Sequence, residues 1–279
     1  MADPLQTVGA VTRLGEAPAE LSPAELVSRT AGWIRHQTPV AIVRFGEGEG
    51  RLLTANSSDQ LSMKVAARKL RRQSGIVFPP QDVLRIKSQV MRAFDEADVV
   101  GIRGSQSFSD EHKMWVAQIE RAFEERVAEG RPPAHVSHCL LNNALRDALP
   151  SLLAGQSRVS VVSCRDVKPY LATMCGVEDV RVFQVPSQYI VRGVDGDYEA
   201  ALHGVPIWPG FYDNVRASLS VRTLGEVFLV GAGIFGKELC VRIRDLGGIA
   251  LDLGSSLDGM ADKVTRGPNK PDPYPLPSA

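Results

Sequence analysis

The sequence predicts an α/β protein whose mostly parallel sheet carries helices on both faces. Two patterns predict this class. Short apolar runs rich in β-branched residues recur along the 279 residues, and stretches of helical period separate most of them. Strands that are covered on both faces are typically apolar throughout, and strands that alternate with helices form parallel sheets. We therefore expect one parallel sheet between two layers of helices.

The first expected elements are a helix and a buried strand. Ser22 has the features of a helix N-cap, because Pro23 stands in the first turn and Glu25 three residues after the cap. The apolar run 39–45 follows and predicts a buried strand. Further strands are expected at residues 97–102, 158–163, 179–185, 226–230 and 249–253, with helices at residues 113–128 and 237–246.

The two ends of the chain differ in composition from the part between them. Residues 1–21 are rich in Ala, Pro and Glu without a period, and residues 266–279 hold five of the 18 prolines. Such ends are expected to form a flexible N-terminal tail and a Pro-rich C-terminal tail. Residues 22–265 contain no linker-like stretch, so we expect a single α/β domain there.

The charge, the apolar runs and the cysteines exclude several classes of protein. Thirty-two Lys and Arg balance 32 Asp and Glu, which excludes a surface that is basic throughout, so we expect no nucleic-acid partner. No stretch reaches the roughly 18 to 20 apolar residues of a membrane helix, and the first residues lack the pattern of a signal peptide. We expect a cytoplasmic protein with reduced cysteines, namely Cys139, Cys164, Cys175 and Cys240.

A glycine-rich acidic loop follows the first expected strand. Arg44, Phe45 and Gly46 precede two glutamates, Glu47 and Glu49, that glycines flank. Ligands of open parallel sheets collect at the carboxyl ends of the strands. In an extended segment the two carboxylates would point to the same side, roughly 7 Å apart, and could hold one hard divalent cation together with diphosphate oxygens. A simple surface turn is the alternative interpretation.

A second glycine-rich loop lies between the expected strand 226–230 and the helix that follows it. Gly231, Gly233 and Gly236 have the Gly-x-Gly-x-x-Gly spacing, and Asp252 ends the next strand about 20 residues later. This spacing suits a pyrophosphate at a helix N-terminus. Only 27 residues follow Asp252, too few for the rest of a dinucleotide-binding half. Close packing of the helix on its strand is the structural alternative.

The two loops together resemble the GT-D type of bacterial glycosyltransferases, which have a Rossmann-like sheet and pair a nucleotide-sugar donor with a divalent metal. Residues 40–49 are similar to a strand and an Arg-Phe-Gly-Asp-Gly-Glu motif of that family. Residues 182–189 resemble its strand followed by Pro-Ser, and residues 229–255 its glycine turn, helix and closing Asp-x-Gly segment. Two positions depart from the family: Glu47 stands where Asp is usual, and Ser255 where His is frequent.

The resemblance implies transfer of a sugar from a nucleoside diphosphate sugar, expected to be a UDP-sugar, to a hydroxyl of a glycan, glycolipid or glycoprotein, as in polysaccharide or glycoconjugate biosynthesis. Glu47 and Glu49 take the positions of the acidic pair that binds Mn²⁺ or Mg²⁺ at the leaving diphosphate. Asp258 is the candidate base for the acceptor hydroxyl, with Asp252 next. Donor contacts are expected from Arg44, Phe45, Gly46, Ser187, Gly231, Gly233 and Gly236.

Two other functions remain open. An NAD(P)- or flavin-dependent oxidoreductase would use the second glycine loop with Asp252. A non-catalytic protein would bind nucleic acid or an acidic partner through a basic cluster on an expected helix, namely Lys64, Arg68, Lys69, Arg71 and Arg72. A solvated helix face is the plain interpretation of this cluster, and contact with an anionic acceptor or a membrane surface is the functional one.

Overall fold

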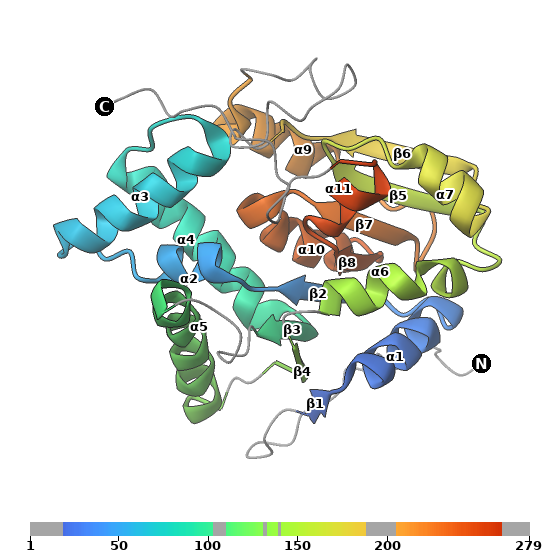
Figure 1. Ribbon diagram of the computed structural model, residues 1–279, viewed down its shortest axis with the longest axis horizontal. Helices are drawn as coiled ribbons and strands as arrows, with labels where there is room; N and C mark the ends of the chain where they lie inside the picture. The colour runs from blue at the N-terminus through green and yellow to red at the C-terminus, as the bar shows by residue number, and fades with distance from the viewer. Residues whose placement is uncertain (1–18, 103–109, 131–132, 139–140, 188–204, 264–279) are drawn as a thin grey trace, which may run out of the picture.

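The described residues form one sheet of eight parallel strands between two layers of helices (Figure 1). The structure is a computed structural model that describes residues 19–102, 110–130, 133–138, 141–187 and 205–263. Every strand pairing among these residues is parallel, in the order β1-β4-β3-β2-β8-β7-β5-β6. The strands are β1 (Ala19–Leu21), β2 (Val40–Arg44), β3 (Val99–Ile102), β4 (His135–His138), β5 (Arg158–Ser163), β6 (Asp179–Gln184), β7 (Val227–Gly231) and β8 (Ile249–Asp252).

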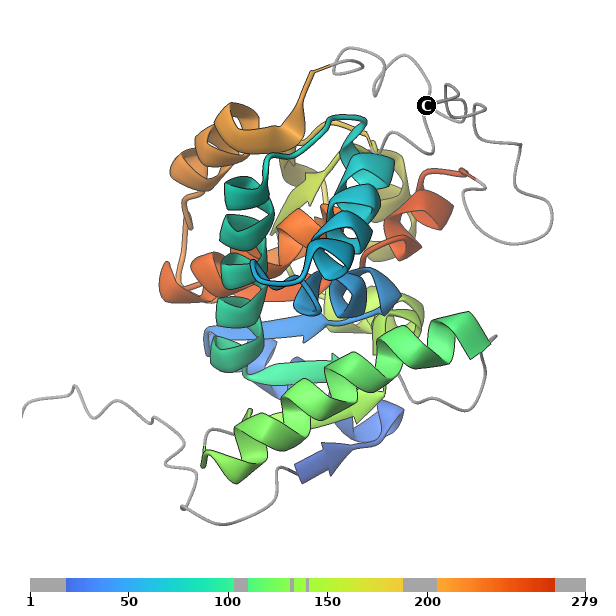
Figure 2. The ribbon, with the colours of Figure 1, turned by 90° about the vertical axis from the view of Figure 1, so that its left-hand side faces the viewer.

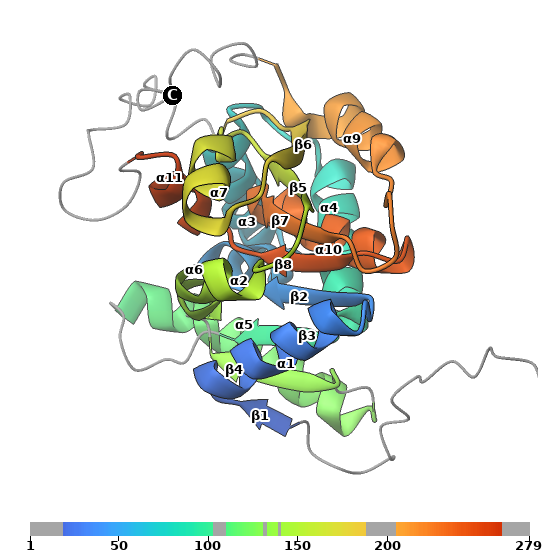
Figure 3. The ribbon, with the colours of Figure 1, turned by 90° about the vertical axis from the view of Figure 1, so that its right-hand side faces the viewer.

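Helices cover both faces of the sheet. One face carries α2 (Glu47–Leu53), α3 (Gln60–Ser74), α4 (Pro80–Glu96), α5 (Asp110–Ala128), α9 (Tyr212–Ser218) and α10 (Gly236–Asp245), most of them in the foreground of Figure 2. The opposite face carries α1 (Pro23–Arg35), α6 (Leu141–Leu152), α7 (Lys168–Cys175) and α11 (Ser256–Met260), which lie toward the viewer in Figure 3. A π-helical turn at Ile207–Phe211 precedes α9, and a 3₁₀ turn at Gly233–Phe235 precedes α10.

The two layers follow from the period of the strands. Successive side chains of a strand point to opposite faces, so a continuous apolar run contributes side chains to the core on each face of the sheet. In β2, Val40 and Ile42 belong to the core under α1 and α6, whereas Ala41 and Val43 belong to the core under α4 and α10. The predicted fold class, an α/β sheet with helices on both faces, is confirmed.

The first helix begins as expected, but the segment before it does not belong to a tail. α1 begins with the expected capping box, in which Ser22 accepts from the N–H of Glu25 and the Glu25 carboxylate accepts from the N–H of Ser22. Ala19–Leu21, assigned to the N-terminal tail, instead form β1, which pairs with β4. The remainder of that tail and residues 266–279 lie outside the described residues. No described helix is long and apolar enough to cross a membrane.

The order of the strands makes the connections leave the middle of the sheet in opposite directions. From β2 the chain leads outward to β3, and from β5 it leads outward to β6 on the other side, with β8 and β7 between them. Ligands of open α/β sheets bind where connections leave in opposite directions. The register places Gly231 beside Ser163 and Asp252 beside Val230, so the ends of these strands border one site.

Candidate functional site

The two glycine-rich loops meet at the carboxyl ends of β2 and β8. Oδ2 of Asp252 accepts hydrogen bonds from the backbone N–H of Arg44 at 3.1 Å and from Nζ of Lys237 at 2.5 Å. The same Nζ lies 3.5 Å from Oε1 of Glu49 on α2. One buried lysine, at the start of α10, therefore joins both loops.

Residues 47–53 form a helix, so the extended geometry predicted for the acidic loop is wrong. Glu49 is the reason: its Oε2 accepts the backbone N–H of Gly46 at 2.8 Å, which caps the first turn of α2. Side chains at i and i+2 of a helix do not face each other. Glu47 accordingly points to α3, where its Oε1 lies 3.4 Å from Nζ of Lys69, while Glu49 points to Lys237.

These two carboxylates do not fit a shared divalent cation as they stand. Each one faces a lysine ammonium of the chain rather than the other carboxylate. A divalent ion requires several oxygen ligands at about 2.0–2.6 Å. Within the part of the chain that the structure describes, no group of three or more His, Cys, Asp or Glu side chains is placed to hold a metal ion.

The charges around Lys237 stabilise one another in spite of their burial. Burial alone would raise the pKa of Glu49, but the charges of Lys237 and Arg44 and the N–H of Gly46 outweigh it, and the pKa lies below its usual value. Burial likewise would lower the pKa of Lys237, but Asp252 and Glu49 outweigh it and the pKa is raised. Glu49 and Lys237 therefore carry opposite charges at neutral pH.

Arg44 is the cation of this site that is best placed for an anionic ligand. It ends β2, and its guanidinium lies beside Gly254, where an added Cβ would stand 3.5 Å from its Nη2. Its Nε is buried and has no hydrogen-bond partner among the described residues. Buried donors without a partner are rare in folded proteins. This one lies at the carboxyl end of β2, close enough to Glu49 for their charges to interact.

The second glycine loop is shaped by close packing. A Cβ on Gly231 would stand 2.6 Å from Cδ1 of Leu257 and 3.0 Å from the carbonyl oxygen of Gly254, and one on Gly236 3.1 Å from Val230. Gly233 has a φ of 58°, a backbone conformation that residues other than glycine rarely adopt. The loop is a strand-turn-helix junction as expected; packing accounts for Gly231 and Gly236, and the backbone conformation accounts for Gly233.

The position of Asp252 argues against a dinucleotide site. In the dinucleotide fingerprint, the acid that ends the second strand binds a ribose hydroxyl. Here Asp252 is only 2% exposed, and its Oδ2 is held by Lys237 and by the backbone of Arg44. Its carboxylate thus binds groups of the protein itself instead of a ribose hydroxyl, which removes the main support for the oxidoreductase interpretation.

The remaining expected donor residues fall into two groups. Phe45 is fully buried and packs edge-on against Phe94 with ring centroids 4.9 Å apart, and the N–H of Gly46 caps α2, so both have structural roles. Ser187, which follows β6, lines a small cavity together with Gly231 and with Gln73 of α3. The Oε1 of Gln73 is buried without a described hydrogen-bond partner.

Asp258 lies on α11 and is oriented by an arginine. Its Oδ1 accepts from Nε of Arg165 at 2.7 Å, and its side chain remains 16% exposed, whereas that of Arg165 is 2% exposed. Arg165 follows β5, so this pair stands at the same edge of the sheet as the two loops. Asp166, next in the chain, accepts from the N–H of Lys168 at the start of α7.

The basic cluster is helical, as expected, and divides between two roles. α3 covers Gln60–Ser74, and only Lys69 of the cluster turns inward to Glu47. The other four side chains are exposed: Lys64, Arg68, Arg71 and Arg72.

Lys237 is the site residue that sequence reasoning missed. It was seen only as the start of a helix, yet it directly follows the last glycine of the loop and precedes the apolar residues 239–241. A lysine at the first turn of a helix opposes the helix dipole. That unfavourable position next to a glycine turn is the signal that could have indicated buried acidic partners.

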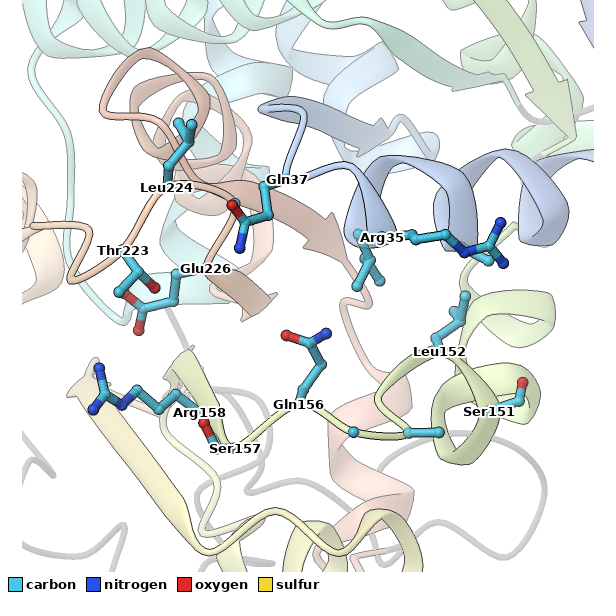
Figure 4. A pocket seen from close by; sticks show the side chains of 15 residues that line it. Arg35, Gln37, Ser151, Leu152, Gln156, Ser157, Arg158, Thr223, Leu224 and Glu226 are labelled. Carbon is cyan, nitrogen blue, oxygen red and sulfur yellow. The ribbon is translucent and has the colours of Figure 1, made fainter.

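A second cavity lies at the opposite, amino edge of the sheet. Its volume is about 560 Å³, and its polar lining includes Arg35, Gln37, Gln156 and Arg158 (Figure 4). None of the expected site residues lines it. Open parallel sheets bind their ligands at the carboxyl ends of the strands, so we place the functional site at the other edge.

Comparisons with known proteins agree with the fold. A family profile described as a GT-D fold-like domain matches residues 21–185. A solved structure of the highly conserved domain of unknown function 1792, described as having a distinct glycosyltransferase fold, has a TM-score of 0.52 at 16% identity, with 87% of this chain and 79% of that chain covered. A selenomethionine-substituted structure of the same domain has a TM-score of 0.52 at 15% identity, with the same coverage.

A third structure, described as a new glycosyltransferase from Streptococcus sanguinis, has a TM-score of 0.50 at 14% identity, with 85% of this chain and 81% of that chain covered. At such identities the likeness concerns the fold. No curated protein matches the sequence.

Proposed function

The chain belongs to the family of GT-D fold-like domains, and on this basis we propose that it is a glycosyltransferase. It moves a sugar from a nucleoside diphosphate sugar, with a UDP-sugar as the first candidate, to an acceptor hydroxyl. The observation that carries the proposal is the family match over residues 21–185, because it includes the loop from Arg44 to Glu49 at the carboxyl end of β2. Two neighbours in fold carry glycosyltransferase descriptions.

The proposed reaction sets two tasks for the protein. The acceptor oxygen bonds to the anomeric carbon, and the bond from that carbon to the diphosphate breaks. The nucleoside diphosphate leaves with the bonding electrons, and the hydroxyl proton passes to a base. The protein must therefore stabilise charge that grows on the diphosphate and hold a group that accepts the proton.

In our proposal, Arg44 contacts the leaving diphosphate. Guanidinium groups match phosphate oxygens in geometry and charge, and the buried Nε of Arg44 lacks a described hydrogen-bond partner. The carboxylate of Asp252, which Lys237 holds in place, accepts a hydrogen bond from the backbone N–H of Arg44 and so positions this residue. Ser187 and the Gly231 turn, which share a small cavity, are assigned to the nucleotide side of the donor.

Asp258 is the proposed base for an inverting transfer. Glu49 and Asp252 are buried and face Lys237, so neither can approach an acceptor. Asp258 keeps part of its surface exposed at the carboxyl edge, and Arg165 fixes its orientation through Oδ1.

A divalent cation at Glu47 and Glu49 has no part in this proposal. The resemblance implies such an ion, but the two carboxylates diverge on α2 and face Lys237 and Lys69. The chain's own cations already balance the acidic charge expected to bind the metal. We therefore assign the stabilisation of the diphosphate to Arg44.

The test is a transfer and hydrolysis assay of the full chain with a panel of UDP-sugars and other nucleotide sugars. Arg44→Met keeps an unbranched apolar stem and removes the charged guanidinium, and it is expected to abolish turnover. Arg35→Met at the opposite edge of the sheet is the matched control and should behave as the native chain. Activity of Arg44→Met equal to that of the control would contradict the assignment, and no turnover with any donor would contradict the proposed reaction.

A further inference from the structure

The exposed face of α3 forms a basic surface next to the candidate site. Five of the 15 residues in α3 are Lys or Arg, and none is Asp or Glu. At about 100° per residue, the exposed residues Leu61, Lys64, Arg68, Arg71 and Arg72 fall within an arc of roughly 100°. The buried residues of the helix, Ala66, Leu70 and Ser74, lie on the opposite side.

Exposed apolar side chains stand at both ends of this basic face. Leu61, in the first turn of α3, is 72% exposed, and Val77, just after the helix, is 75% exposed. They are two of the five large apolar side chains that are exposed in the described part of the chain. The combination of a basic helix face with exposed aliphatic residues is typical of helices that lie on an anionic lipid surface.

We propose that α3 docks the protein on an anionic membrane surface through Leu61, Lys64, Arg68, Arg71, Arg72 and Val77. Charge complementarity selects an anionic partner, and the two aliphatic side chains favour lipid over a dissolved polyanion, which offers no apolar layer for them. The arrangement is independent of any membrane-spanning segment, because it uses only one amphipathic helix face.

The same helix connects the docking face to the candidate site. Lys69 reaches inward to Glu47, and Gln73 and Ser74 line the cavity that contains Ser187 and Gly231. α3 stands at the outer rim of the molecule, next to α2 (Figures 1 and 2). Docking through α3 thus brings the carboxyl edge of the sheet close to the lipid surface, where a lipid-linked acceptor would be held.

The test is co-sedimentation of the full chain with phosphatidylcholine vesicles that contain or lack phosphatidylglycerol. We expect binding only to the anionic vesicles and release at high salt, since ions screen exposed charges. Arg68→Glu/Arg72→Glu should weaken binding at least about tenfold, because each basic residue contributes near an anionic surface. Arg29→Glu/Arg35→Glu on α1 is the matched control and should bind as the native chain does.

Two further measurements keep the outcome decisive. Lys64→Gln/Arg71→Gln is a milder change on the same face and should also weaken binding. It replaces the charge-reversal variant in the test if that variant does not fold. Equal binding to both kinds of vesicle, equal effects of the α3 and α1 variants, or binding to dissolved dextran sulfate without binding to vesicles would each overturn the proposal. Vesicle binding is measured without a sugar donor, so its failure leaves the proposed transfer reaction untouched.

Discussion

The ammonium of Lys237 lies 2.5 Å from Oδ2 of Asp252, and both side chains are almost fully buried. Because Lys237 also faces Glu49, this pair connects α10, the end of β8 and the first turn of α2. A buried charge is tolerated only when partners compensate for its lost hydration. The pair therefore has a structural role: it supports the backbone of Arg44 and connects the two glycine-rich loops.

Removing the ammonium of Lys237 should strongly destabilise the folded protein. Lys237→Met leaves Asp252 and Glu49 as buried carboxylates without their cation, and we expect the free energy of unfolding to fall by about 3–5 kcal/mol. Urea denaturation measures the change. Lys168→Met, at an exposed lysine on α7, is the control and should change stability by less than about 0.5 kcal/mol. If Lys237→Met lowered the free energy of unfolding by as little as the control does, the structural role of the Lys237–Asp252 pair would be contradicted.

The charge of Glu49 should make stability depend on acid pH. Its folded pKa is below the usual value, so its charge contributes stability that is complete above the unfolded pKa of about 4.3 and disappears as the pH falls through the folded pKa. The native chain should be more stable than Glu49→Gln by about 1–3 kcal/mol at pH 7. This difference should shrink on acidification below about pH 4. A difference that stays constant from pH 7 to pH 3 would show that the carboxylate charge is not responsible.

Removal of divalent metal should leave donor binding intact. Glu47 and Glu49 face lysines, and Arg44 is the group assigned to the diphosphate. Calorimetric titration of the full chain with UDP should give the same affinity with EDTA as with added Mn²⁺, within about twofold. A strong gain with Mn²⁺ that Glu49→Gln abolishes would restore the metal site implied by the resemblance.

A side chain at Gly231 should destabilise the junction of the two loops. The added methyl of Gly231→Ala meets Leu257 and a backbone oxygen at 3.0 Å or less, and we expect a loss of about 1–3 kcal/mol. Gly32→Ala in α1 is the matched control, since its Cβ meets nothing within 4 Å. That control should gain about 0.5–1 kcal/mol from better helix propensity. Thermal unfolding of both variants measures the contrast, and equal effects would refute close packing.

Loss of the proposed base should affect turnover more than donor binding. Asp258→Asn keeps the size of the side chain, and kcat should fall about 10²–10⁴-fold with little change in the KM for the donor. Asp262→Asn, an exposed position nearby, is the control and should keep native kcat. A rise in the donor KM with unchanged kcat would assign Asp258 to binding.

Much of the fold could be predicted from the sequence because strand burial leaves a local pattern. β5 was predicted with the observed bounds, Arg158–Ser163, and the capping box at Ser22 is a pattern within four residues. β1 was missed because it is short and its pairing with β4 joins residues more than 100 positions apart. Such strands are defined by their neighbours rather than by their own sequence.

The sequence by itself determined the parallel α/β fold, the two glycine-rich loops and their place at the carboxyl edge, since strand periodicity and glycine spacing are local properties. Only the tertiary structure decided what the charges in those loops do. Glu49 caps a helix, Asp252 holds Lys237 beneath Arg44, and Glu47 turns to Lys69. These pairings join α2, α3, β8 and α10, and their energies depend on burial and on distances of a few ångströms, which no local pattern specifies.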